Sequence, residues 1–179
     1  MPSSITYESS KWIIWKAVIT PSTCYHCACM NGRILSVDDP EANSIPVHIN
    51  CRCHIEAVMA VPAGLATNEG ADGVDMYVAL NGRLPDRYIT QAEAKQQGWK
   101  KALGNLDDVL PGKIIGGDIY KNRDHRLPDA PGRTWYEADF DYSGGYRNSY
   151  RLIFSNDGLI FVTYDHYMTI YEIGVSSIE

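Results

Sequence analysis

Four ionisable side chains in the C-terminal half of the chain have types that suit chemistry at a phosphate. Glu137 follows the run RTWY, Arg147 and Arg151 lie four residues apart, and His166 lies within TYDHYMTIY. A carboxylate can act as a base, an imidazole as an acid, and fixed guanidinium groups can bind phosphate oxygens. No acidic metal cluster accompanies them in the sequence. We therefore expect phosphoryl transfer without a catalytic metal, provided that the fold brings the four together.

Each of these residues also has a simpler interpretation. Glu137 could be an exposed strand residue paired with an arginine, and a lone His166 is more often a surface histidine than a catalyst. Two arginines four residues apart usually form a salt-bridged, solvated face. Spacing alone leaves both interpretations open.

The cysteines offer a second kind of chemistry. All five lie in the first third of the chain: Cys24, Cys27, Cys29, Cys51 and Cys53. Cys24 and Cys27 have the spacing of two thiolates on one turn, and His48 and Cys51 repeat that spacing. These four could hold a structural zinc ion, with Cys53 as the alternate ligand and Cys29 also in reserve. Disulfides or free thiols are the other interpretations.

The elements that must position the four residues follow from local patterns. Helical spacing in GVDMYVALNG predicts a helix after Gly73, and Thr90 with Glu93 forms a capping box for a second helix that ends near Gly98. A third helical turn begins at Asn105. After Pro111, alternation, aromatic residues and turn signals predict strands. Helices first and strands after predict an α+β fold with an antiparallel sheet.

Composition limits the organisation and the partners. We expect a small N-terminal Cys/His module at residues 1–61, a linker at 62–71 and a main domain at 72–179, because the cysteines stop before a Gly/Ala-rich stretch. The formal net charge of −6 argues against binding nucleic acid by bulk electrostatics. The sequence contains no apolar run long enough to predict a membrane span, and the apolar stretch near the N-terminus is too short for a secretory signal.

Part of the Cys/His module resembles the C-terminal end of the minor head proteins of Mu-like phages. The resemblance covers about residues 12–57 and rests on a Cys-x-x-Cys, a Gly and a Pro-x-His-x-x-Cys-Arg-Cys ending. The matching residues are Cys24, Cys27, Gly32, Pro46, His48, Cys51, Arg52 and Cys53. The resemblance implies a phage-derived module of the kind found upstream of toxin domains.

The main domain resembles the barnase-like, guanyl-preferring microbial ribonucleases from about residue 72 to residue 171. The segments LPDRYIT, GNL, PGK, IGGDI, GRTW, EAD, RNS and DHY occur in the family's order without a gap. The resemblance implies N-terminal helices packed on a five-stranded antiparallel sheet. It also implies RNA cleavage without a metal cofactor.

The same resemblance assigns the catalytic roles. Glu137 would be the general base for the ribose 2′-hydroxyl, and His166 the acid for the leaving 5′-oxygen. Arg147 and Arg151 would bind the scissile phosphate. The first step would be a transesterification to a 2′,3′-cyclic phosphate, which restricts the substrate to RNA.

Further positions fall on the family's substrate contacts: Gln91, Tyr120, Asn122, Arg123, Asp124 and Tyr167. Asn122, Arg123 and Asp124 match the guanine-recognition loop, in which Asp124 replaces the usual Glu. Gln91 replaces a lysine, which predicts a weaker phosphate site. Arg133 and Asp157 match a structural ion pair that we expect to be buried.

These observations predict an endoribonuclease that acts as a bacterial toxin or effector, secreted or delivered into the cytoplasm of target cells. A proteinaceous inhibitor or immunity protein would protect the producer. The alternative is a phage-structural or zinc-dependent interaction protein with a weakened or inactive nuclease-like domain. A secreted scavenging ribonuclease is a third possibility. The intact set of Glu137, Arg147, Arg151 and His166 favours the enzyme.

Overall fold

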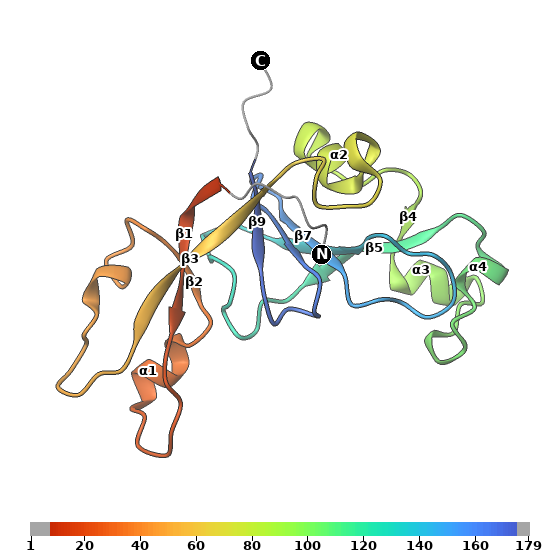
Figure 1. Ribbon diagram of the computed structural model, residues 1–179. Coiled ribbons are helices and arrows are strands. Elements are labelled where there is room, and N and C mark those ends of the chain that lie inside the picture. The colour runs from red at the N-terminus through yellow and green to blue at the C-terminus, as the bar shows by residue number, and fades with distance from the viewer. Residues whose placement is uncertain (1–7, 175–179) are drawn as a thin grey trace. The chain divides into compact units, whose positions relative to one another are not determined.

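The computed structural model describes residues 8–174 (Figure 1). These residues form two compact units. The first contains residues 60–121 and the chain from Arg133 onward, and the second contains residues 9–59 and 122–132. The second unit thus combines the N-terminal segment with residues 122–132, which in the sequence connect two strands of the first unit. In the described part of the chain, no helix is long and apolar enough to cross a membrane.

The first unit is built on an antiparallel meander in which each strand pairs with the next along the chain. Its strands are β5 (Ile114–Tyr120), β6 (Trp135–Asp139), β7 (Arg151–Ser155), β8 (Ile160–Thr163) and β9 (Tyr171–Gly174). Parallel strands extend it on both sides. The short β4 (Tyr88–Ile89) pairs with β5, and residues 60–62 of β3 (His54–Pro62) pair with β9.

The helices of the first unit are short. They are α2 (Val74–Asn81), α3 (Gln91–Gln96) and α4 (Leu106–Val109), with 3-10 turns at Gly70–Asp72 and Lys101–Leu103. The capping box predicted for the second helix is confirmed, because the Thr90 and Glu93 side chains each accept from the other's backbone amide. This cap compensates for a helix of only six residues, which is too short to be stable alone.

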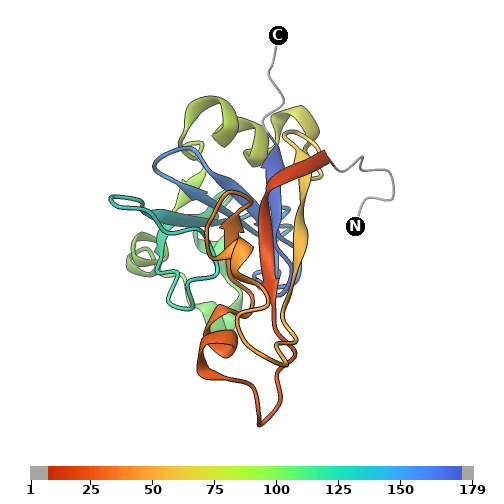
Figure 2. The ribbon, with the colours of Figure 1, turned by 90° about the vertical axis from the view of Figure 1, so that its left-hand side faces the viewer.

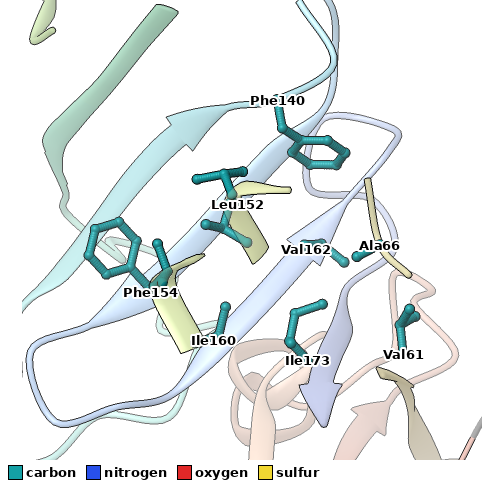
Figure 3. Close-up of a cluster of buried hydrophobic side chains, with 10 residues drawn as sticks. Val61, Ala66, Phe140, Leu152, Phe154, Ile160, Val162 and Ile173 are labelled. Atoms are coloured by element: carbon teal, nitrogen blue, oxygen red, sulfur yellow. The ribbon is translucent and has the colours of Figure 1, made fainter. Parts of the chain in front are cut away.

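The core of the first unit lies on one face of the meander. Figure 3 shows Leu152 and Phe154 of β7 beside Ile160 and Val162 of β8, all buried. The cluster also includes Val61, Ala66, Val74, Val78, Phe140 and Ile173. Alternation within β6 and β7 therefore places one set of side chains in this core and the other set on the opposite face.

The second unit has its own strands and one helix. β1 (Glu8–Lys16) pairs antiparallel with β2 (Ile34–Ser36), and β3 is the next neighbour of β1 in the strand order. Figure 2 shows β1 and β3 side by side. Between β1 and β2 lies α1 (Tyr25–Met30), and a 3-10 turn follows at Ala42–Ser44.

The predicted fold of helices packed on a five-stranded antiparallel sheet is wrong. Within residues 8–174 the backbone hydrogen bonds give nine strands in the order β2-β1-β3-β9-β8-β7-β6-β5-β4, with parallel and antiparallel neighbours, and the helices are few and short. The prediction failed because it gave no strands to the N-terminal segment. Runs such as KWIIWK and HIEAVMAV are rich in β-branched and aromatic residues and form strands.

Residues 62–71 are fixed to the first unit by hydrogen bonds. The buried Asp75 carboxylate on α2 accepts from the backbone amides of Gly64 and Ala66 at 2.7 and 3.1 Å, and from the Thr67 hydroxyl at 3.2 Å. Tyr164 donates its hydroxyl to the Ala66 carbonyl at 2.8 Å. The stretch is therefore an ordered connection.

Candidate functional site

The candidate active site lies on the face of the meander opposite the core in Figure 3. Glu137 of β6 is directly opposite Asp118 of β5, and Asp139 is directly opposite Arg151 of β7. Thr163 of β8 continues the row from Arg151. Residues directly opposite each other share a face, and so do residues two apart in one strand. The register therefore gathers three carboxylates and an arginine on one surface.

A β-bulge aligns β5 with this surface. The pairing passes from Gly116 opposite Ala138 to Asp118 opposite Glu137, so Gly117 is the extra residue on β5. Gly117 has a φ of +94°, which a residue with a side chain rarely adopts. The glycine pair in IGGDI thus allows Asp118 to share the face of Glu137.

The two arginines converge on Asp139, which is almost fully buried. Arg147 donates from Nε and Nη2 to the Asp139 carboxylate at 2.6 and 2.7 Å, and Nη1 of Arg151 lies 3.0 Å from Asp139 Oδ1. The guanidinium side chains are only 11% and 6% exposed. Burial lowers the pKa of Arg147, but the hydrogen bonds and charge of Asp139 outweigh this effect and raise it overall. The trio carries one net positive charge, held rigidly.

Tyr167 connects this surface to the aromatic residues beside it. Its hydroxyl donates a short hydrogen bond to Oε2 of Glu137. Its ring stacks on that of Tyr120, with centroids 5.3 Å apart and an interplanar angle of 26°. Burial, followed by the hydrogen bond to Glu137, raises the pKa of Tyr167, so the phenol stays protonated and donates. Tyr167 therefore fixes the orientation of the Glu137 carboxylate.

His166 lies in the turn between β8 and β9, although the pattern after Pro111 predicted strands throughout this region. His166 and Tyr167 have φ values of +57° and +69°, so the chain turns sharply here. The His166 amide donates to the Ser149 carbonyl at 3.1 Å, and its exposed ring meets the Tyr167 ring edge to face, with centroids 5.1 Å apart. The turn presents an accessible imidazole beside the residue that contacts Glu137.

Asp165 holds this turn in shape. Its Oδ1 accepts from the Thr169 amide at 2.8 Å and from the Thr163 hydroxyl at 2.9 Å. Burial raises the pKa of Asp165, but these hydrogen bonds outweigh it and lower the pKa below its ordinary value. A carboxylate committed to two donors in a turn is a structural residue.

The other residues predicted from the resemblance fall in different places. The backbone amide of Gln91, at the start of α3, donates to Asp118 Oδ2 at 2.9 Å. Gln91 therefore lies next to the face of the sheet that carries Asp118 and Glu137. Asn122, Arg123 and Asp124 begin the 122–132 stretch, which belongs to the second unit. Asn122 is buried, with a φ of +41°, whereas Arg123 and Asp124 are exposed.

The expected ion pair between Arg133 and Asp157 is present, but it is not buried. Arg133 Nη2 lies 2.8 Å from Asp157 Oδ2, and the Asp157 side chain is 46% exposed. The hydrogen bond from Arg133 lowers the pKa of Asp157 to about 2. Because solvent screens such a pair, its loss should cost less stability than the loss of a buried ion pair.

In the second unit, three of the four predicted metal ligands lie in one group, and the fourth, Cys51, lies in a second group that shares only Cys27 with the first. Cys24, Cys27 and His48 offer ligand atoms within 4.8 Å of one another, and so do Cys27, Cys51 and Cys53. Cys27 Sγ lies 3.4 Å from His48 Nε2 and 4.0 Å from Cys51 Sγ. Two tetrahedral zinc ligands are separated by roughly 3.5 to 3.8 Å at ordinary bond lengths. Each group thus offers three donors at spacings close to those of zinc ligands, and Cys27 is common to both.

Local hydrogen bonds orient these side chains, and the surroundings shift the pKa values of the thiols in different directions. Cys24 is the N-cap of α1, and its Sγ accepts from the Cys27 amide. His48 Nδ1 lies 2.8 Å from the Ile49 carbonyl, which directs Nε2 toward the sulfurs. Hydrogen bonds from backbone amides lower the pKa of Cys51 to about 7, whereas burial raises the pKa of Cys27. Cys29 is exposed and belongs to neither group of ligands.

Sequence reasoning missed two parts of the active site. One is Asp139, which neutralises part of the charge of the arginines, and the other is the hydrogen bond from Tyr167 to Glu137. The alternation of Glu137 and Asp139 in WYEAD could have indicated that both lie on one face of the strand. No local signal could have shown the contact made by Tyr167, because it joins residues 30 positions apart.

Comparison with known proteins gives two matches to family models. Residues 72–173 match a model described as ribonuclease, and residues 3–56 match one described as Phage Mu protein F like protein. A ribonuclease of Heyndrickxia coagulans is 54% identical over 98 residues, which are 55% of this chain and 90% of that protein. A ribonuclease of Bacillus intermedius is 52% identical over 105 residues, 59% of this chain and 65% of that protein. The ribonuclease of Bacillus pumilus has the same identity and coverage.

Proposed function

The chain belongs to the ribonuclease family, and we propose that it cleaves single-stranded RNA internally, after guanine, without a catalytic metal. The observation that carries this proposal is the face shared by Glu137, Arg151 and Asp139, with Arg147 bonded to the same carboxylate. It pairs a carboxylate base with two rigid guanidinium groups. This combination suits an anionic phosphate that gains charge in the transition state.

The proposed reaction is a transesterification followed by hydrolysis. The Glu137 carboxylate takes the proton of the 2′-hydroxyl as its oxygen bonds to phosphorus. His166 gives a proton to the 5′-oxygen as the P–O5′ bond breaks, and a 2′,3′-cyclic phosphate remains. Water then opens the ring, with His166 as base and Glu137 as acid. No electron donor or acceptor is needed.

The arginines would hold the phosphate through donors that Asp139 does not use. The bonds to Asp139 engage Nε and Nη2 of Arg147, which leaves its Nη1 for a phosphate oxygen. Asp139 would fix the guanidinium plane before the substrate arrives. Such preorganisation is the main way in which a site of this kind lowers an activation barrier.

Guanine preference would come from Asn122, Arg123 and Asp124. In this proposal backbone groups of Asn122 and Arg123 and the Asp124 carboxylate bind the base edge, while Tyr120 and Tyr167 provide the aromatic surface. Asp124 is one methylene shorter than the usual Glu, so the preference should be weaker than in the family. Its measure is the ratio of kcat/KM for GpN and ApN dinucleotides.

The deciding experiment is cleavage of a GpN dinucleotide in EDTA. We expect a cyclic phosphate product, and we expect Glu137→Gln and His166→Ala each to reduce kcat by about 10²-fold or more. The matched control is Glu172→Gln on β9. Activity that requires added metal, or a Glu137→Gln enzyme with unchanged kcat, would contradict the mechanism.

We further propose that the second unit holds a structural zinc ion through Cys24, Cys27, His48 and Cys51, with Cys53 as the alternate to one of them. Zinc would fix the ends of the loops that carry its ligands. Zinc content after purification in zinc should be one per chain. It should fall in Cys27→Ser, which affects both ligand groups, and stay in Cys29→Ser. Comparison of Cys51→Ser with Cys53→Ser identifies the fourth ligand.

The biological role that fits these proposals is a toxin or effector domain delivered into the cytoplasm of a target cell. A ribonuclease of this kind endangers the cell that makes it, so we propose a small proteinaceous inhibitor that covers the active site. Expression of Glu137→Gln without the inhibitor should be tolerated where expression of the wild type is not. Equal toxicity of the two would contradict the role.

A further inference from the structure

Residues 9–59 of the N-terminal Cys/His module form one compact unit with the 122–132 stretch. We infer that the module is the scaffold of this stretch, called here the base loop, and thereby sets the enzyme's preference for a base. The inference rests on the proposed role of the loop in binding guanine. It assigns a function within the nuclease to a segment that resembles a phage protein.

A backbone hydrogen bond at the edge of β2 joins the module to the base loop. The Ile34 amide donates to the Arg126 carbonyl at 2.7 Å. β2 is the first strand in the order, with β1 on its other side, so its outer edge would otherwise present unpaired backbone groups. The base loop satisfies one of these groups.

A second contact lies two residues earlier in the chain, at Gly32. Gly32 has a φ of +83°, and a Cβ at this position would lie 3.4 Å from Nε of Arg126. The Arg126 side chain thus covers the glycine at the entry to β2. Both contacts fall on Arg126, in the middle of the base loop, where they can fix the position of the loop as a whole.

Other hydrogen bonds join residues of the base loop to one another. The buried Asn122 side chain donates to the Leu127 carbonyl at 2.9 Å and accepts from the Leu127 amide at 3.0 Å. It also donates to Asp129 Oδ1 at 2.8 Å. These bonds give residues 122–129 an internal shape. The contacts with Gly32 and Ile34 act on this shape from outside, through Arg126.

The metal ligands are close to these two contacts along the chain. Cys27 lies in α1, whose last residue, Met30, is buried and accepts from the Arg33 amide at 3.0 Å. The Gly32 amide donates to the Trp15 carbonyl at 2.8 Å. A helix of six residues is not stable alone, so ligation of Cys27 would order α1, the turn after it and the edge of β2.

The test compares two ways of weakening the support in the full chain. Cys27→Ser removes the ligand common to both groups, with Cys29→Ser as its control. Ile34→Pro removes the amide that bonds Arg126, with Ile34→Val as its control. Amide hydrogen exchange at His125 and Leu127 reports the order of the loop, and exchange at Leu152 and Ile153 reports the nuclease core.

We expect Cys27→Ser and Ile34→Pro to speed exchange at Leu127 and to leave the core amides protected. The GpN to ApN ratio of kcat/KM should fall about tenfold, which corresponds to about 1.4 kcal/mol, the scale of one hydrogen bond. The loss should appear mainly in KM for GpN. Both controls should behave as the wild type.

Unchanged exchange at Leu127, or an unchanged ratio despite faster exchange, would overturn the inference. If Cys27→Ser unfolds the nuclease core as well, the comparison of Ile34→Pro with Ile34→Val decides. A wild type that cleaves RNA with no preference for guanine would overturn the role in specificity. A wild type that does not cleave RNA would instead refute the proposed function, while the exchange data would still decide whether the module supports the loop.

Discussion

At the scale of single residues, Asp139 explains how two arginines can occupy a nearly dry site. Each guanidinium would be costly to bury alone, and the shared carboxylate offsets that cost through close hydrogen bonds. The pairing also fixes where the remaining donors point. In the proposed mechanism, Asp139 therefore positions the two arginines and takes no part in proton transfer.

Replacement of Asp139 by Asn should be far more damaging than replacement of Asp157. Asp139→Asn leaves two buried guanidinium groups without their charge partner and should lower the free energy of unfolding by about 3 kcal/mol or more. Urea denaturation at neutral pH measures this change. If Asp139→Asn costs no more than Asp157→Asn, the trio does not stabilise the fold.

The ion pair of Arg133 with Asp157 predicts a dependence of stability on pH. The pKa of Asp157 is depressed from 3.8 to about 2 in the folded chain. The pair therefore stabilises the fold above pH 3.8, and the contribution disappears as the pH falls to about 2. Asp157→Asn should cost about 1 kcal/mol at pH 7, after allowance for screening. Its unfolding curve should approach that of the wild type at the acid end.

Gln91 stands where the family has a lysine beside the phosphate. Its backbone amide is held by Asp118, so a lysine at this position would add positive charge next to the acidic face. Gln91→Lys should raise kcat/KM for GpN several-fold through stronger phosphate binding. Gln96→Lys, on the same helix, is the matched control for net charge. Equal gains from the two would mean that only bulk charge matters.

At the scale of elements, short structures are stabilised by contacts outside themselves. The bulge at Gly117 aligns β5 with β6, the turn after β8 presents His166, and the capping box starts α3. Residues 62–71 have no regular strand of their own beyond the end of β3, and they depend on side chains such as Asp75. The conformation of each of these short elements therefore depends on contacts with neighbouring residues.

Asp75→Asn tests the role of residues 62–71. The buried carboxylate accepts from two backbone amides and one hydroxyl, and hydrogen bonds to a charged group are worth about 1.5 to 3 kcal/mol each before desolvation is counted. The variant should lose about 2 to 4 kcal/mol of unfolding free energy, measured by urea denaturation. Asp72→Asn, at an exposed position of the preceding turn, should change it little.

At the scale of the whole molecule, the chain is acidic while its substrate is a polyanion. The net charge of −6 gives little attraction for RNA at a distance, so binding should depend on Arg147 and Arg151, the proposed phosphate ligands. Two guanidinium groups that share one carboxylate neutralise few phosphates. Binding should therefore be local rather than distributed over the surface.

The dependence of kcat/KM on salt concentration measures how many phosphates of the RNA the enzyme neutralises. With one to two phosphates neutralised on a single strand, the plot of log kcat/KM against log salt should have a slope of about −0.7 to −1.4. Gln91→Lys should steepen the slope by about 0.7. A wild-type slope steeper than about −3 would show that RNA binding extends well beyond the two arginines.

The sequence by itself determined the residue types of the site, the capping box of α3, the partners of the Arg133 ion pair and the grouping of the cysteines with His48. These follow from local spacing or from a collinear resemblance. It could not determine the strands of the N-terminal segment, because the resemblance on which the fold prediction rested begins after them. Nor could it place His166 in a turn, because β-branched and aromatic residues favour strands only on average.

Only the tertiary structure decided which residues meet. The register between β5, β6 and β7 placed Glu137 with Asp118 and Asp139 with Arg151, and the turn after β8 brought Tyr167 to Glu137. It also grouped the 122–132 stretch with the N-terminal module. Such contacts join residues far apart in the chain, and their energies depend on burial and register. No local pattern of residue types carries that information.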